Sequence, residues 1–144
     1  MNILLVASHG GHCAELLSLR EAWEGHKQLM VVTQGAGNPP GVLEVDPIGE
    51  DLWSLLKAFV RFRRIVAEFQ PDAVVSTGAE VALPAMFWGR LYGARTLYIE
   101  CSARVRSASL TGRILSRWVT ACWVQWPTAL GAFKGRARFH GGTV

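Results

Sequence analysis

The chain has 144 residues, of which half are hydrophobic and 18% are charged, and its formal net charge is +4. This length predicts one domain with a substantial core and excludes two ordinary domains, and the composition excludes a disordered chain. The positive charge is concentrated in one part. Residues 1–99 hold eight Lys and Arg against ten Asp and Glu, whereas residues 100–144 hold seven against Glu100 alone. Such a basic surface attracts nucleic acid, anionic lipid or a phosphorylated substrate, and the lack of a recognisable nucleic-acid-binding motif argues against nucleic acid as a partner.

The cysteines and the apolar stretches indicate a cytoplasmic protein. The three cysteines are odd in number and lack CxxC spacing, which is typical of reduced thiols rather than of a disulfide or zinc framework. The first residues lack the basic region of a signal peptide, and no apolar stretch reaches the roughly 20 residues needed to span a bilayer. We therefore expect any contact with a membrane to be peripheral, on its cytoplasmic face.

The first element is an apolar strand over residues 3–7, followed by Ser8, His9, Gly10, Gly11 and His12. Adjacent glycines let a backbone come close to a ligand, and the free N–H groups of a helix's first turn favour anions. A histidine at this position adds a group that can exchange a proton near neutral pH. The same pattern also fits a plain strand-to-helix turn, and the pentapeptide alone leaves both readings open.

The rest of the chain alternates between strands and helices. Apolar runs predict further strands over residues 28–33, 42–45, 71–76, 96–99 and 121–124. Helical spacing and end signals predict helices over residues 51–69, 81–92 and 110–118. Residues 34–41 have the composition of a loop, and the glycine-rich, basic tail from residue 133 has no periodicity. This order predicts one α/β domain over residues 1–144, with a parallel sheet covered by helices on both faces.

Ligands of such sheets bind at the carboxyl ends of the strands, which directs attention to the loops at residues 8–12, 76–80 and 100–109.

The helix over residues 51–69 carries two stripes. A core stripe is expected from apolar residues at helical spacing, namely Leu52, Leu55, Leu56, Phe59, Phe62 and Val66. A basic stripe consists of Lys57, Arg61 and Arg64, with Trp53 and Val60 beside it. The basic stripe is either an ordinary solvated face or a surface that lies on anionic lipid head groups, where cations and an aromatic ring act together.

Three segments in the second half resemble the motif series of a known family: residues 98–105 (YIECSARV), 110–115 (LTGRIL) and 124–127 (VQWP). The family is the acceptor-side, membrane-recruiting subunit of the two-subunit N-acetylglucosaminyltransferase of asparagine-linked glycosylation, with counterparts in bacterial exopolysaccharide clusters. The first loop, with Glu15 and Leu16, and residues 75–78 are also similar to motifs of this family. A more distant similarity links the chain to the N-terminal domain of the enzyme that makes peptidoglycan lipid II.

The resemblance implies a Rossmann-like domain equivalent to the N-terminal, acceptor-binding half of a B-type glycosyltransferase. A separate subunit would then supply the donor-binding half, with the basic tail from about residue 128 leading towards it. The implied reaction moves a sugar from UDP-GlcNAc or UDP-glucuronate to a polyprenyl-pyrophosphate-linked saccharide, and this chain alone would be inactive. Two features depart from the family. Eukaryotic members have an N-terminal hydrophobic anchor, whereas this sequence begins at its first expected strand. The segment between residues 34 and 51 is also short and lacks an expected basic motif.

The implied chemistry assigns roles to particular residues. His12 or Glu100 would take the proton of the attacking hydroxyl, with His12 favoured as the base and Glu100 in support. Glu100 could instead cap a helix or pair with Arg104 or Arg106.

The acceptor and its phosphates are expected to contact small or polar residues of the three loops, namely Ser8, His9, Gly10, Gly11, Thr77, Gly78, Ser102 and Arg104. Gln125, Trp126 and Pro127 are expected to face the partner subunit, or to pack locally at the end of the last strand. No Asp-x-Asp pair is present, so we expect no metal and no cofactor on this chain.

Two other functions remain open at this point. The chain could be a non-catalytic membrane scaffold that recruits an active partner, or an unrelated nucleotide-binding α/β enzyme that uses residues 8–12 for phosphate.

Overall fold

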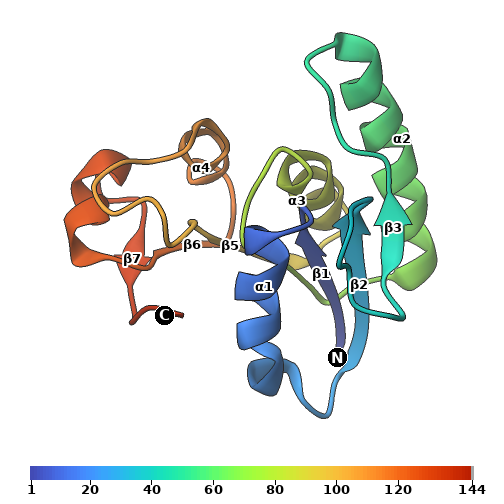
Figure 1. The fold of residues 1–144 in the computed structure, drawn as a ribbon, viewed down its shortest axis with the longest axis horizontal. Helices are drawn as coiled ribbons and strands as arrows, with labels where there is room; N and C mark the ends of the chain where they lie inside the picture. The colour runs from blue at the N-terminus through green and yellow to red at the C-terminus, as the bar shows by residue number, and fades with distance from the viewer. Residues whose placement is uncertain (144) are drawn as a thin grey trace.

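The computed structural model describes residues 1–143 and is built around one parallel sheet. Within these residues the sheet has seven strands in the order β3-β2-β1-β4-β5-β6-β7, and every neighbouring pair is parallel. The strands are β1 (Asn2–Ala7), β2 (Lys27–Thr33), β3 (Leu43–Val45), β4 (Ala73–Ser76), β5 (Arg95–Ile99), β6 (Ala121–Val124) and β7 (Arg138–Phe139). The chain reverses direction across the sheet between β3 and β4, which is the doubly wound arrangement of a Rossmann-like fold (Figure 1).

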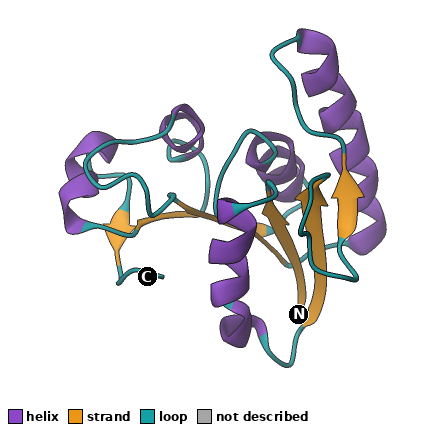
Figure 2. Ribbon diagram, viewed as in Figure 1, coloured by secondary structure: helices purple, strands orange, loops and turns teal. Residues whose placement is uncertain are grey.

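Helices cover both faces, as the sequence predicts. The helical elements are α1 (Gly11–Ser18), α2 (Leu52–Phe69), α3 (Ala82–Leu91) and α4 (Leu110–Leu115), with the 3₁₀ helices η1 (Arg20–Trp23) and η2 (Pro127–Phe133) (Figure 2). One core lies between the sheet and the side formed by α2, α3, α4 and η2, and it includes Leu4, Phe62 and Tyr98. A smaller core lies under α1, where Leu5 and Leu16 are buried.

The structure differs from the sequence prediction at one helix end and adds one strand near the end of the chain. The helix predicted over residues 110–118 ends at Leu115, because the chain turns there to enter β6. The tail from residue 133, in which the sequence shows no periodicity, follows directly on η2 and contains the two-residue strand β7, which pairs with β6 through Trp123 and Val124. A two-residue strand is too short to leave an alternating pattern. Val144, the last residue of the predicted tail, lies outside the described residues.

The predicted core stripe of α2 is buried only in its second half. Phe62, Ile65 and Val66 are buried, whereas Leu52 is 70% exposed and Leu56 is 45% exposed. Figure 1 shows the reason: the first turns of α2 extend past the strands, so no sheet lies beneath them. These leucines therefore belong to an exposed apolar surface, next to the exposed side chains of Trp53 and Val60.

Within residues 1–143, no helix combines the length and the apolar character that crossing a membrane requires.

Candidate functional site

The three loops singled out by the sequence meet at one edge of the sheet, because β1, β4 and β5 are adjacent and parallel. They border a cavity of about 630 Å³. Its lining combines polar and apolar side chains, namely His12, Ala79, Glu80, Leu83, Tyr98, Glu100, Cys101, Ala103, Arg104, Ser109, Leu110, Thr111 and Ile114. The cavity thus contains a histidine, an exposed arginine and two carboxylates within one concave surface.

His12 is fixed by the loop after β4. Its Nδ1 lies 3.0 Å from the carbonyl oxygen of Thr77, and the Thr77 hydroxyl donates to the His12 carbonyl oxygen at 2.6 Å. Because a carbonyl oxygen only accepts, Nδ1 carries the proton of the neutral ring and Nε2 keeps its lone pair. The neutral histidine is therefore held in the tautomer that can accept a proton at Nε2.

Gly78 makes room for this histidine. Its φ of +137° is one that side-chain-bearing residues rarely adopt, and a Cβ atom there would lie 2.6 Å from Cε1 of His12. Its N–H donates to the Ser76 hydroxyl at 3.3 Å. Thr77 is fully buried, and both residues position His12; the role of Thr77 and Gly78 as phosphate ligands stays a prediction.

Gly10 and Gly11 behave differently from Gly78. Gly10 has a φ of +84°, which explains a glycine at the turn, whereas Gly11 starts α1 without a positive φ. A Cβ atom on either residue would meet nothing within 4 Å. The open space beside Gly11 leaves its backbone accessible to a ligand. His9 lies to the side, where its N–H donates to the Thr33 hydroxyl at 3.0 Å and its ring packs against Gly35.

Glu100 is buried beneath the cavity, with only 1% of its surface exposed. One carboxylate oxygen accepts from the amide of Cys101 at 3.0 Å and from the Tyr98 hydroxyl at 3.4 Å. The other accepts from the amide and the hydroxyl of Ser109, each at 2.9 Å. These four bonds favour the supporting role over that of a base.

Two neighbours adapt to the Glu100 carboxylate. Gly112 leaves space for it, since a Cβ atom there would lie 2.3 Å from the carboxylate oxygen. Burial, reinforced by the charge of Glu100, raises the pKa of the Tyr98 phenol well above its ordinary value, so Tyr98 remains a hydrogen-bond donor. Glu100 therefore holds the start and the end of the loop at residues 100–109. Apart from Tyr98, which lies two residues before Glu100, no sequence pattern indicated which groups bind this carboxylate.

Glu15 is a site residue that the sequence analysis did not assign. It follows His12 by three positions on α1, and this spacing places the two side chains on the same side of the helix. Its carboxylate accepts from the amide of Ser102 at 3.0 Å, from the Ser102 hydroxyl, and from Nε2 of Gln125 at 3.3 Å. The Ser102 hydroxyl is thus bound to Glu15, and its contact with an acceptor phosphate stays a prediction.

The segment at residues 125–127 lies mostly inside the domain. The Gln125 side chain is 4% exposed and also donates to the carbonyl of Glu100 at 3.0 Å, so it does not face a partner. Nε1 of Trp126 donates to the carbonyl of Ser102 at 2.6 Å, and Pro127 is exposed. A partner contact thus stays a prediction for Trp126 and Pro127 only.

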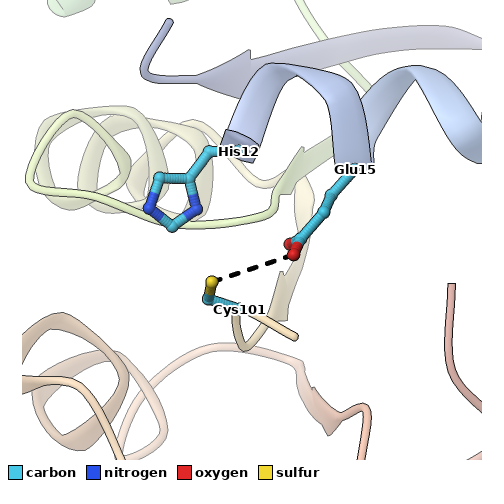
Figure 3. A group of neighbouring side chains, drawn as sticks. All are labelled: His12, Glu15 and Cys101. Atoms are coloured by element: carbon cyan, nitrogen blue, oxygen red, sulfur yellow. Dashed lines mark hydrogen bonds between the residues drawn. The ribbon is translucent and has the colours of Figure 1, made fainter. Parts of the chain in front are cut away.

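One group near the cavity has the donor set of a metal site. Ligand atoms of His12, Glu15 and Cys101 lie within 4.8 Å of one another, and the Cys101 thiol donates to Glu15 at 3.8 Å (Figure 3). Burial, with added effects of the Glu15 and Glu100 charges, raises the pKa of the Cys101 thiol despite the opposing bond from the Ala103 amide. A thiol held protonated and a carboxylate already bound by Ser102 and Gln125 are poor ligands as they stand.

The predicted membrane surface is exposed on α2. Trp53 is 71% exposed, Val60 is 58% exposed, and Lys57, Arg61 and Arg64 are exposed around them. Lys57 and Arg61 also line a hollow of about 430 Å³ whose other residues include Asp46 and Asp51. Lys57 and Arg61 therefore share this hollow with carboxylates, whereas Arg64 does not line it.

The chain is similar in sequence to two kinds of N-acetylglucosamine transferase protein. The chain is 28% identical to the UDP-N-acetylglucosamine–N-acetylmuramyl-(pentapeptide) pyrophosphoryl-undecaprenol N-acetylglucosamine transferase of Synechococcus sp., over 94% of this chain and 42% of that protein. It is 33% identical to the UDP-N-acetylglucosamine transferase subunit ALG14 of Eremothecium gossypii, over 59% of this chain and 40% of that subunit. The chain thus spans less than half the length of either relative.

Solved structures show the same fold. MurG of Acinetobacter baumannii superposes with a TM-score of 0.73 at 22% identity, over 88% of this chain and 42% of that one. The UDP-N-acetylglucosamine 2-epimerase of Rickettsia bellii superposes with a TM-score of 0.76 at 13% identity, over 99% of this chain and 45% of that one. These matches confirm the predicted Rossmann-like half of a B-type glycosyltransferase fold.

The family model for Alg14-like oligosaccharide biosynthesis proteins matches residues 46–143. The matched segment includes the loops after β4 and β5, and with the two named relatives it confirms the resemblance seen in the sequence. Because the match covers more than half of the chain, this protein belongs to the Alg14-like family of oligosaccharide biosynthesis proteins.

Proposed function

We propose that this chain is the acceptor-binding subunit of a heteromeric glycosyltransferase. In this proposal a partner subunit holds a UDP-sugar, either UDP-GlcNAc or UDP-glucuronate, and this chain holds a polyprenyl-pyrophosphate-linked saccharide at the cytoplasmic face of the membrane. The names of the two relatives support it, since one is a transferase subunit and the other is named for a pyrophosphoryl-undecaprenol acceptor.

The observation that carries the proposal is the histidine held in one tautomer beside a cavity that an arginine also lines. His12 donates through Nδ1 to Thr77, which leaves Nε2 to accept the proton of an attacking sugar hydroxyl. Arg104 is exposed on the same cavity wall and can reach an acceptor phosphate, and the open backbone at Gly11 can approach the same anion. In this proposal Ser8, His9 and Gly10, which precede Gly11 in the same loop, also contact the acceptor.

Glu100 and Glu15 act through the loop that carries Arg104. Glu100 binds both ends of that loop, and Glu15 ties its Ser102 to α1, the helix that begins beside His12. In this role both carboxylates are positioning residues. They keep the base and the phosphate-binding arginine at a fixed separation, which favours a productive acceptor geometry.

Membrane contact is assigned to the exposed surface of α2. Trp53 and Val60, with Lys57, Arg61 and Arg64, combine apolar and cationic groups that suit anionic head groups. This contact would bring the cavity to a lipid-linked acceptor.

The test is reconstitution of sugar transfer with a donor-type partner subunit, a UDP-sugar and a polyprenyl-pyrophosphate-linked saccharide. We expect transfer only when both subunits are present, and a fall of about 10²- to 10⁴-fold in kcat for His12→Ala. A pure scaffold would keep full turnover after this substitution. Binding of a free UDP-sugar to this chain alone, measured by calorimetry, would instead favour a nucleotide-binding enzyme.

A further inference from the structure

Two rows of apolar side chains run outward from the cavity along neighbouring helices. Leu83, Phe87 and Leu91 follow one another at four-residue spacing on α3, and Leu110, Ile114 and Trp118 do the same on α4 and the turn after it. Residues four apart lie on one side of a helix, and α3 and α4 lie side by side (Figure 1). The two rows therefore face a common groove.

The groove is continuous with the candidate site. Leu83, Leu110 and Ile114 line the cavity that also contains His12 and Arg104. The outer members of the rows, Phe87, Leu91 and Trp118, line a second hollow of about 470 Å³ together with Arg90. The apolar surface thus begins beside Arg104 and leads away from it between α3 and α4.

Much of this surface is open to solvent. Leu110 is 75% exposed, Leu91 is 65% exposed, and Phe87 and Ile114 are each 41% exposed. Contiguous exposed apolar surface of this kind marks a binding site more often than an ordinary solvated face. A flat contact with a bilayer would not explain why the apolar strip enters a polar cavity at one end.

We propose that the groove between α3 and α4 holds the first isoprene units of the acceptor's polyprenyl chain. The occupant must be a linear amphiphile, because its head lies at Arg104 in the cavity and its tail follows the two apolar rows. From Leu83 to Leu91 the groove follows about 12 Å of helix, which accommodates roughly two or three isoprene units. This inference rests on the proposed function, since it assigns the tail of the same acceptor.

The experiment measures binding of two probes to the full chain by calorimetry: inorganic pyrophosphate, and farnesyl pyrophosphate as a short prenyl analogue. We expect farnesyl pyrophosphate to bind at least about tenfold more tightly, since burial of each methylene group adds to affinity. The double variant Leu91→Gln, Leu110→Gln should lose most of this advantage, which is measured as the ratio of the two affinities within each variant, so that any change at the cavity wall affects both probes. Glutamine retains the size and helix propensity of leucine and adds no charge near Arg104.

Leu52→Gln is the matched control, because Leu52 is 70% exposed on α2 and lies outside the groove. It should keep the full advantage of farnesyl pyrophosphate. Equal affinity of the two probes for the unaltered chain would overturn the inference, as would an advantage that survives in the double variant or disappears equally in the control. Binding to anionic vesicles that falls in the double variant but not in Leu52→Gln, without a change for farnesyl pyrophosphate, would reassign the groove to the bilayer and also overturn it.

Failure of the groove and failure of the proposed function give different results. If the reconstituted complex transfers sugar and the double variant leaves the KM for a long-chain acceptor unchanged, the groove assignment is wrong and the function stands. If the complex transfers no sugar while farnesyl pyrophosphate binding depends on Leu91 and Leu110, the function is wrong and the prenyl groove stands.

Discussion

His12 and Thr77 are joined by two hydrogen bonds that cross between neighbouring loops. The imidazole Nδ1 donates to the Thr77 carbonyl at 3.0 Å, and the Thr77 hydroxyl donates to the His12 carbonyl at 2.6 Å. This reciprocal pair fixes both the position of the ring and its tautomer.

The first prediction separates the ring's positioning from its chemistry. His12→Asn keeps an N–H group near the Thr77 carbonyl but removes Nε2, so we expect kcat of the reconstituted enzyme to fall about 10²- to 10⁴-fold with little change in thermal stability. Steady-state kinetics and a melting curve measure the two effects. His26→Asn is the control, because His26 is exposed at the opposite end of the sheet, before β2. Turnover unchanged in His12→Asn would exclude histidine base catalysis.

Two glycine substitutions should have opposite effects. In Gly112→Ala the new Cβ would lie 2.3 Å from the buried Glu100 carboxylate, so we expect a loss of about 1–3 kcal/mol in unfolding free energy. In Gly11→Ala the methyl group meets no protein atom, so the fold should be as stable as before or slightly more stable. Binding of the pyrophosphate head group should weaken in Gly11→Ala, as calorimetry can measure. Unaltered affinity there would mean that the acceptor does not approach Gly11.

Removing the Glu15 carboxylate should loosen the loop that carries Arg104. Glu15→Ala leaves the amide of Ser102 without its acceptor and removes one of the two acceptors of the Gln125 side chain, which we expect to cost about 1–3 kcal/mol of unfolding free energy. Because Glu15 is a positioning residue, Glu15→Ala should raise the KM for acceptor more than it lowers kcat. Glu15→Gln should keep part of the stability and of the acceptor affinity that Glu15→Ala loses. Glu21→Ala, an exposed position on η1, serves as the control in denaturant titrations and kinetics.

The buried Cys122 thiol should make the protein sensitive to alkali. Burial, with a smaller contribution from the charge of Glu100, raises the pKa of Cys122 to about 12. An unfolded cysteine ionises near pH 8.5, so the folded state keeps the thiol protonated at pH values where the unfolded chain loses the proton. The contribution of Cys122 to the unfolding free energy is therefore fully present below pH 8.5 and is lost as pH rises towards 12, at about 1.4 kcal/mol per pH unit. Cys122→Ala should reduce the slope of unfolding free energy against pH by the contribution of one ionising group, as measured by urea titrations between pH 9 and 10.5. The slopes of the two proteins should agree between pH 6 and 8, and equal slopes above pH 9 would contradict the assignment.

Membrane contact through α2 predicts salt-sensitive binding to anionic vesicles. Each cation near such a surface contributes about 1 kcal/mol, so Arg64→Gln should weaken vesicle binding roughly fivefold, and Trp53→Ala should weaken it as well. Co-sedimentation with vesicles at two salt concentrations measures the effect. Lys134→Gln removes an exposed cation after η2 and should leave binding unchanged. Equal losses in Lys134→Gln and Arg64→Gln would indicate attraction by net charge alone.

The sequence by itself determined the elements and their layout. Apolar runs of four to six residues at regular intervals predicted six of the seven strands in residues 1–143, and alternation with helices predicted a parallel sheet. Since parallel strands end at one edge, the convergence of the loops with His12, Thr77 and Glu100 also followed. Local pattern carries this information because side chains alternate with fixed periods in strands and helices.

Only the tertiary structure decided what the polar side chains do. Glu15 meets Ser102 and Gln125, which are 87 and 110 positions away, and no local pattern records such pairs. Likewise, the apolar spacing of Leu52 and Leu56 predicted burial, but whether a helical face is covered depends on where the sheet ends beneath it. Periodicity specifies which residues share a face, whereas hydrogen bonding and burial depend on the element that packs against that face.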